Sequence, residues 1–208
     1  MMDGDFTGTS FENPQLQAAY EDMVVPSNPS WHREHIRRLV AAGIQPHFML
    51  GHIHQLESVE RLIRRGHYCG PLILNYVAIG GSVAGLNPAD MLEFVRRVPD
   101  GAVLTLETLN RHVYPMTAMA IALGLHVRCG IEDNLWNQHR TEKMTTVEQI
   151  KQLVRIATEM GRPVANGKEA RDILKIGVFY DSVEETLAAN GFAPNPRGGQ
   201  QGFLRKVA

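Results

Sequence analysis

Residues 71–79 read PLILNYVAI, and residues 102–106, the first part of AVLTLET (residues 102–108), read AVLTL. Both runs are apolar almost throughout, whereas a strand with one face in water alternates apolar and polar residues. Continuous apolar runs of this length are typical of strands that are covered on both faces. The two stretches therefore predict a buried parallel β-sheet.

A helical pattern follows each of these runs. The first is followed by NPADMLEFVRRV (residues 87–98), in which Asn87 is a capping residue and Pro88 occupies the first helical position. The second is followed by YPMTAMAIALG (residues 114–124), which is apolar nearly all round and favours a helix packed on several sides. This alternation of strand and helix predicts βα units.

The same order of elements occurs before and after these two units. An earlier unit consists of PHFMLGH (residues 46–52) and LESVERLIRRG (residues 56–66), and a later one of HVRCGI (residues 126–131) and TTVEQIKQLVRIATEMG (residues 145–161). A helix, SNPSWHREHIRRLVAAG (residues 27–43), precedes them all. The sequence lacks the alternation of apolar and polar residues that is typical of an antiparallel sheet.

The number of units limits the architecture. Four clear βα units, with the end of a fifth strand near the N-terminus, fall short of a closed (β/α)8 barrel, which needs eight strands and typically about 250 residues. We therefore predict an α/β fold, an incomplete (β/α)8 TIM barrel with about four to five βα units. We assign residues 1–175 to this partial barrel and residues 176–208 to a partly flexible C-terminal extension, which is rich in glycine and proline near its end.

The composition is that of an ordinary globular protein. Of the 208 residues, 44% are hydrophobic, and 21 Lys plus Arg nearly balance 22 Asp plus Glu. This balance argues against a nucleic-acid partner and against an anionic membrane surface. The N-terminus lacks the pattern of a signal peptide, and no apolar stretch approaches the roughly 18 residues that span a bilayer. We expect a soluble protein.

Two cysteines, Cys69 and Cys129, are too few and too far apart for a disulfide framework. We interpret them as small buried side chains rather than reactive thiols. A chain without disulfides suits a reducing compartment, so the sequence predicts a cytoplasmic location.

Candidate site residues follow the predicted strands, because ligands of parallel α/β sheets bind at the carboxyl ends of the strands. After the first strand come His52 and His54. In an extended segment two residues one position apart point to the same side, so both imidazoles could reach one metal ion. The alternative is that the two histidines begin a polar loop.

The next two strand ends offer candidate contacts to a ligand. Gly80 and Gly81 permit close backbone approach to a ligand such as a phosphate or a pantetheine amide, although a plain tight turn is an equal alternative. The third strand ends with Glu107 and Thr108, and Arg111 follows beside the start of a helix. Arg111 is a candidate anion contact, with a solvated loop arginine as the alternative.

The fourth strand ends in the stretch HVRCGIEDN (residues 126–134). Strand alternation places Val127, Cys129 and Ile131 on one side and Arg128 on the other. If the apolar set faces the helices, Arg128 points into the barrel interior. A buried cation needs a partner, and the nearest candidates are Glu132 and Asp133. This pattern predicts either a functional group of charges or a structural ion pair.

With these residues in view, the stretch LGLHVRCGIEDNLW (residues 123–136) resembles the signature of the β-keto acid cleavage enzymes, the family of the 3-keto-5-aminohexanoate cleavage protein. The resemblance continues upstream through NRHVYPMTAMAIALG (residues 110–124) and downstream to residue 174, and it covers roughly residues 1–175. It implies a zinc-dependent TIM barrel that condenses a β-keto acid with acetyl-CoA and releases acetoacetate and a new acyl-CoA.

The resemblance also implies roles for single residues. Glu132 matches a zinc ligand, and Arg128 and Asp133 match a pair that assists proton transfer and carbon–carbon cleavage. Zinc would act as a Lewis acid that polarises the keto group of the substrate. The family and the exposed strand edges of a partial barrel both favour a homo-oligomer.

The sequence departs from the family pattern in two places. Family members carry a His-x-His pair of zinc ligands on an early strand, followed by a glycine-rich strand end, and the resemblance implies that this chain begins after both and lacks the N-terminal third of the family pattern. His47 also stands where an acidic residue is expected. Two accounts follow. Either catalysis is lost or weakened, which leaves a binding or oligomerising remnant, or His52 and His54 join Glu132 in a three-ligand zinc site. The identity of the keto acid is not determined.

Overall fold

The computed structural model describes residues 12–21, 23–24, 27–78, 87–108 and 113–198. Its strands are β1 (Phe48–Leu50), β2 (Ile73–Ala78), β3 (Val103–Thr108) and β4 (His126–Val127). They form one parallel sheet in the order β1-β2-β3-β4, so each strand lies beside the next one along the chain. This arrangement confirms the predicted α/β fold and matches part of a (β/α)8 barrel.

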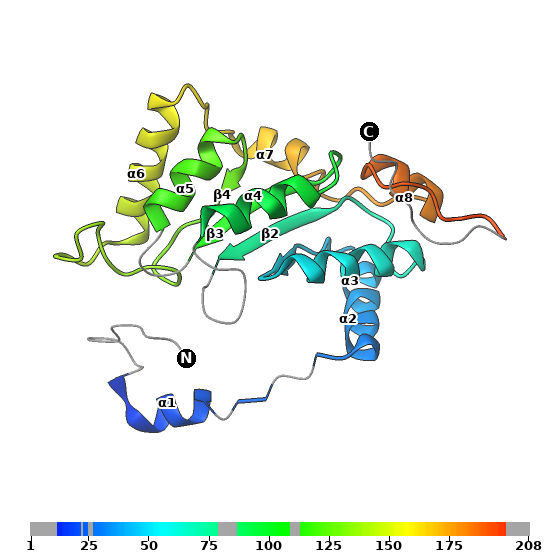
Figure 1. Cartoon of the computed structure of the whole chain (residues 1–208), viewed down its shortest axis with the longest axis horizontal. Helices are drawn as coiled ribbons and strands as arrows, with labels where there is room; N and C mark the ends of the chain where they lie inside the picture. The colour runs from blue at the N-terminus through cyan, green and yellow to red at the C-terminus, as the bar shows by residue number, and fades with distance from the viewer. Residues whose placement is uncertain (1–11, 22, 25–26, 79–86, 109–112, 199–208) are drawn as a thin grey trace.

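Helices alternate with these strands (Figure 1). The first helix lies apart from the sheet in Figure 1, whereas the helices that follow the first three strands pack directly on it. The helices are α1 (Pro14–Glu21), α2 (Pro29–Ala41), α3 (Ile53–Arg64), α4 (Pro88–Arg97), α5 (Val113–Ala122), α6 (Thr146–Glu159), α7 (Gly167–Ile173) and α8 (Val183–Ala189).

Local capping residues set where several helices begin. The Asn87 side chain accepts a hydrogen bond from the Ala89 N–H ahead of Pro88, as the sequence predicted. At the start of α6, Thr145 and Glu148 form a capping box, in which each side chain accepts from the backbone N–H of the other. Such caps satisfy N–H groups that have no partner within the helix.

The core lies between the sheet and helices α3, α4 and α5. All six residues of β2 are buried, which confirms the prediction of a strand covered on both faces. Tyr76 of β2 packs against Phe94 of α4, with ring centroids 4.4 Å apart. The same cluster contains Val59, Ile63, Leu72, Leu74, Met91, Leu104, Leu106, Met116 and Ala120.

The strand expected at residues 126–131 is much shorter than predicted. Only His126 and Val127 pair with β3, and the Arg128 N–H adds one hydrogen bond to the Leu106 carbonyl oxygen, at 2.9 Å. The chain then turns, and the Asp133 N–H donates to the Gly130 carbonyl oxygen at 3.0 Å. The alternation therefore stops before Ile131, which is 53% exposed.

The C-terminal part of the described chain packs on the opposite, amino-terminal end of the sheet. Leu187 of α8 is buried in the core. Asn190 accepts from the Leu72 N–H at 2.8 Å and donates to the Gly70 carbonyl oxygen at 3.0 Å. The boundary at residue 175 stays a prediction, and residues 199–208 lie outside the described part. No described helix has both the length and the apolar content to cross a membrane.

Candidate functional site

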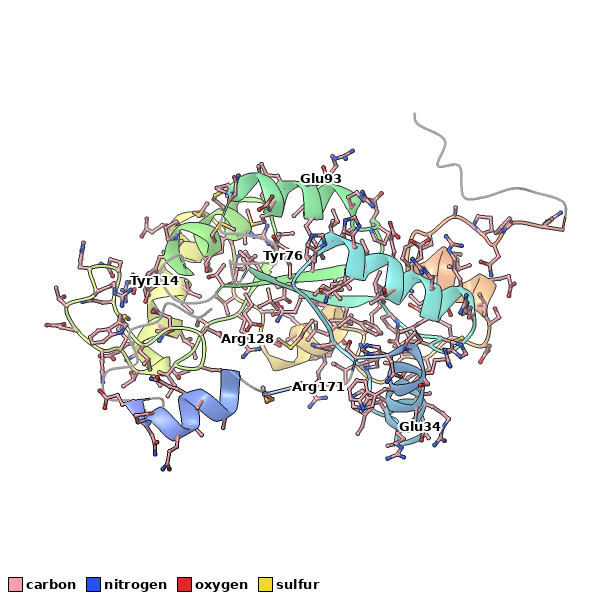
Figure 2. All side chains as sticks on the ribbon, turned by 60° about the horizontal axis from the view of Figure 1, so that its bottom comes forward. Glu34, Tyr76, Glu93, Tyr114, Arg128 and Arg171 are labelled. Carbon is pink, nitrogen blue, oxygen red and sulfur yellow. The ribbon has the colours of Figure 1, made fainter. Side chains whose placement is uncertain are left out.

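Arg128 is the centre of a group of charges at the carboxyl end of the sheet. Figure 2 shows it among interior side chains, while Glu34 and Glu93 lie on the outer rim. Its Nη1 donates to Glu107 at 3.0 Å, and its Nη2 donates to Glu132 and lies 3.5 Å from Asp133. The structure therefore brings Arg128, Glu132 and Asp133 together, as the sequence predicted for the charged partners of a buried arginine.

Glu107, near the end of β3, also belongs to this group, although no role was predicted for it from the sequence. Its side chain is only 4% exposed, and it accepts hydrogen bonds from Arg128 and from the Asn75 side-chain amide of β2. Asn75 pairs in register with Thr105, two residues before Glu107, so both side chains occupy the same face of the sheet. The sequence feature that could have predicted this role is a carboxylate near the end of a strand that is otherwise mostly apolar.

Asp133 is the most strongly perturbed acid of the group. It is 3% exposed, and this burial, together with the nearby Glu107 carboxylate, raises its pKa to about 7, although Arg128 opposes the rise. Burial disfavours the charged form, and a second carboxylate at close range does the same. A carboxylic acid with a pKa near neutrality can both accept and return a proton under ordinary conditions.

Three buried polar atoms beside these charges have no hydrogen-bond partner in the described part of the chain. They are Asn75 Oδ1, Thr108 Oγ1 and Asp133 Oδ2. Asp133 Oδ2 can hydrogen bond to Glu107 only through a shared proton, since both groups are otherwise acceptors. Unsatisfied buried atoms at the carboxyl end of a parallel sheet are typical of a place that receives a ligand.

His52 and His54 occupy a different environment from the one expected. The segment is extended only at His52, with φ −151° and ψ 144°, because α3 begins at Ile53. His52 is the N-cap of α3, and its Nδ1 accepts from the His54 N–H at 3.2 Å. The two rings stack with their centroids 4.6 Å apart. The Nδ1 lone pair of His52 is therefore used to cap the helix.

The structure does not bring these histidines to Glu132. They follow β1, Glu132 follows β4, and these are the two outer strands. Three strand spacings amount to roughly 14 Å, whereas zinc ligands lie about 2 Å from their ion. The Glu132 side chain is 81% exposed and is bound to Arg128. Among the described residues, no three His, Cys, Asp or Glu side chains are grouped so that they could hold a metal ion.

The remaining candidates are placed only in part. Gly80, Gly81 and Arg111 lie outside the described residues. Cys69 and Cys129 are both free and half-buried. Burial and the Asp133 carboxyl raise the pKa of the Cys129 thiol, which keeps it protonated near neutral pH. This protonated state agrees with a packing role for Cys129.

A parallel α/β sheet that gathers an arginine and buried carboxyl groups at the carboxyl ends of its strands is a scaffold suited to acid–base chemistry. The family model described as beta-keto acid cleavage enzyme matches residues 5–176. The chain belongs to this family.

Individual relatives agree with the family match. The chain is 32% identical over 139 residues to the 3-keto-5-aminohexanoate cleavage enzyme of Acetoanaerobium sticklandii, a match that covers 66% of this chain and 50% of the relative. It is 28% identical over 138 residues to the enzyme of the same name from Fusobacterium nucleatum, with the same coverage. It is 25% identical over 158 residues to the 3-dehydrocarnitine:acetyl-CoA trimethylamine transferase of Rhizobium meliloti, covering 74% of this chain and 51% of the relative. The chain spans about half the length of these relatives.

Proposed function

We propose that this chain supplies the acid–base residues for β-keto acid cleavage, in which a β-keto acid and acetyl-CoA give acetoacetate and a new acyl-CoA. The observation that carries the proposal is the contact between Arg128 and Asp133, at 3.5 Å, in a chain that belongs to this family. The two residues lie at the carboxyl end of a parallel sheet, where such folds bind their substrates.

The proposed reaction begins with a proton transfer to Asp133. The β-keto acid substrate loses a proton from the carbon between its keto and carboxylate groups. The resulting carbanion attacks the thioester carbonyl of acetyl-CoA, and the CoA thiolate is expelled. The thiolate then attacks the original keto carbon, and the adjacent carbon–carbon bond breaks. The products are the new acyl-CoA and the acetoacetate carbanion, which recovers the proton from Asp133.

Asp133 and Arg128 have complementary parts in this scheme. The raised pKa of Asp133 suits a group that must take up a proton and return it near neutral pH. Arg128 favours the ionised form of Asp133, which is the form that accepts the proton. Gly80, Gly81 and Arg111 remain the candidate contacts to substrate or coenzyme A.

Zinc does not fit the residues that the structure describes, because no group of three potential ligands occurs among them. The reaction is therefore written with no step through a metal ion. A zinc site that includes Glu132 needs ligands from outside these residues. A cytoplasmic location and a homo-oligomeric state also stay predictions.

A second candidate function is that of a non-catalytic family member that acts as a binding or oligomerising unit. Exposed apolar side chains beside both outer strands favour it, since such groups are typical of surfaces that contact another chain. Met49 of β1 is 54% exposed, and Ile131, after β4, is 53% exposed.

The test is the conversion of β-keto acids by the purified chain in the presence of acetyl-CoA, with the new acyl-CoA measured by mass spectrometry. We expect Asp133→Asn to lower the rate about a hundredfold or more, because the proton acceptor is removed. The matched control is Asp172→Asn, which alters an exposed aspartate of α7. No turnover by the unmodified chain, or full turnover by Asp133→Asn, would contradict the proposal, and the former would favour the second candidate.

A further inference from the structure

The guanidinium of Arg128 is bound on two sides. Its Nη1 donates to Glu107 at 3.0 Å, and its Nη2 lies 3.5 Å from Asp133. The N–H groups of a guanidinium have a fixed, planar arrangement, so a carboxylate bound at Nη1 also sets the direction in which Nη2 points. The position of Arg128 relative to Asp133 therefore depends on Glu107.

Arg128 needs such an anchor because its side chain is not enclosed by the protein. That side chain is 34% exposed, whereas the Asp133 side chain is 2% exposed. A long side chain with access to water can adopt several rotamers. Without the hydrogen bond at Nη1, the guanidinium would be free to turn away from the buried Asp133 carboxyl group.

Glu107 is itself fixed by the sheet. It lies in β3 with its side chain buried, and it accepts a hydrogen bond from the Asn75 side-chain amide of the adjacent β2. Asn75 is buried as well, in a strand whose six residues are all buried. Side chains on such elements are held more precisely than side chains on loops. Hydrogen bonds thus run from β2 through Glu107 to Arg128, which follows β4.

We infer that Glu107 and Asn75 are positioning residues, which hold the Arg128 guanidinium against Asp133. Neither of them needs to touch the substrate, because each acts through the next side chain in the series. The inference rests on the proposed function, in which Arg128 and Asp133 are the acid–base residues. The restraint on Arg128 is nevertheless a property of the chain alone, so it can be measured without substrate.

A purely structural role for Glu107 has a different consequence. Its loss would lower the fraction of folded chain, and hence the rate, by the same factor whether or not Arg128 is present. A positioning residue loses its effect once the side chain that it positions has been removed. A cycle of single and double variants therefore separates the two roles.

The first experiment measures the motion of the Arg128 side chain by NMR relaxation of the full chain, with its Nε–H signal assigned from Arg128→Lys. We expect an order parameter of about 0.8 in the unmodified chain and below about 0.6 in Glu107→Leu, with a smaller decrease in Asn75→Leu. Glu107→Gln keeps an acceptor oxygen and should retain most of the restraint. Thermal unfolding identifies the variants that remain folded.

The second experiment measures the turnover of a β-keto acid with acetyl-CoA. We expect Glu107→Leu to lower kcat about tenfold with little change in KM, because a displaced catalytic group slows the reaction step more than substrate binding. In the Arg128→Gln background, the same change should lower kcat less than about twofold. Where Glu107→Leu does not fold, Asn75→Leu replaces it in both experiments.

The matched control is Glu93→Leu, because Glu93 also binds an arginine, Arg96, but from an exposed position on α4 at the rim of the molecule in Figure 2. It should leave both the motion of Arg128 and kcat unchanged. A mobile Arg128 in the unmodified chain, an unchanged order parameter in the folded leucine variants, or equal losses of kcat with and without Arg128 would each overturn the inference. If the unmodified chain has no turnover, the proposed function fails, and the order parameters alone decide the inference.

Discussion

At the scale of single residues, the site depends on how one arginine is shared. Arg128 reaches Glu107 and Asp133 on its buried side and Glu132 on its exposed side. The exposed contact with Glu132 contributes little to stability, because water screens it. The buried contacts have a larger effect on stability, since loss of Arg128 would leave two buried carboxyl groups without this cation.

The pKa of Asp133 leads to a prediction about stability. In the folded chain this pKa is about 7, above the ordinary aspartate value of 3.8. Between these two values the folded state keeps a proton that the unfolded state has released. The contribution of this group to the free energy of unfolding is therefore full below pH 4 and falls as the pH rises toward 7.

We expect Asp133→Asn to make the free energy of unfolding less dependent on pH between about 4 and 7, because asparagine does not titrate. Urea unfolding at a series of pH values measures this dependence. Asp172→Asn should retain the slope of the unmodified chain. An identical slope in Asp133→Asn would show that the proton on Asp133 is not linked to folding.

At the scale of elements, short-range contacts determine where helices begin. They also fix the orientation of His52 and His54, the two candidate zinc ligands. Thr145 and Glu148 close the start of α6 by a capping box. His52 and Gln55 form the capping box at the start of α3. A histidine whose ring nitrogen caps a helix is held in one orientation, and that nitrogen is not free to bind a metal ion.

The cap of α6 can be tested by a pair of threonine substitutions in the same region. Thr145→Ala removes the side-chain acceptor at the helix start and should lower the free energy of unfolding by about 1 kcal/mol. Thr158→Ala, inside α6, removes a hydroxyl that donates to the Val154 carbonyl oxygen. It should have little effect or stabilise slightly, because alanine is the better helix former. Equal losses in thermal or urea unfolding would contradict the role of the cap.

At the scale of the whole molecule, the sheet separates residues that the sequence grouped together. The histidines that follow β1 and the glutamate that follows β4 lie at opposite edges of the four strands. Distance across a sheet grows by about 4.8 Å per strand, and side chains cannot close a gap of three such steps around one ion. The geometry of the described residues therefore argues against a zinc site made of His52, His54 and Glu132.

We expect His52, His54 and Glu132 not to share a zinc ion, because the histidines follow β1 and the glutamate follows β4, the two outer strands of the described sheet. Elemental analysis by mass spectrometry measures the zinc content. Glu132→Ala and the double variant His52→Ala, His54→Ala should not change it. One zinc per chain, lost in both variants, would show that these residues share an ion after all.

The alternation of strands and helices could be predicted from the amino-acid sequence, because periodicity and capping depend on near neighbours in the chain. The buried β2, the Asn87 cap and the grouping of Arg128 with Asp133 and Glu132 could all be predicted in this way. The family resemblance gave these charges their chemical meaning, and the family match agrees with it.

The contacts between side chains of different strands are visible only in the folded chain. The register of β2 and β3 places Asn75 and Glu107 on one face of the sheet, and the turn after β4 brings Asp133 back to Arg128. Such contacts depend on strand pairing and on packing between residues far apart in the sequence. For that reason the part played by Glu107 became visible only in the folded chain, and the separation of the histidines from Glu132 did so as well.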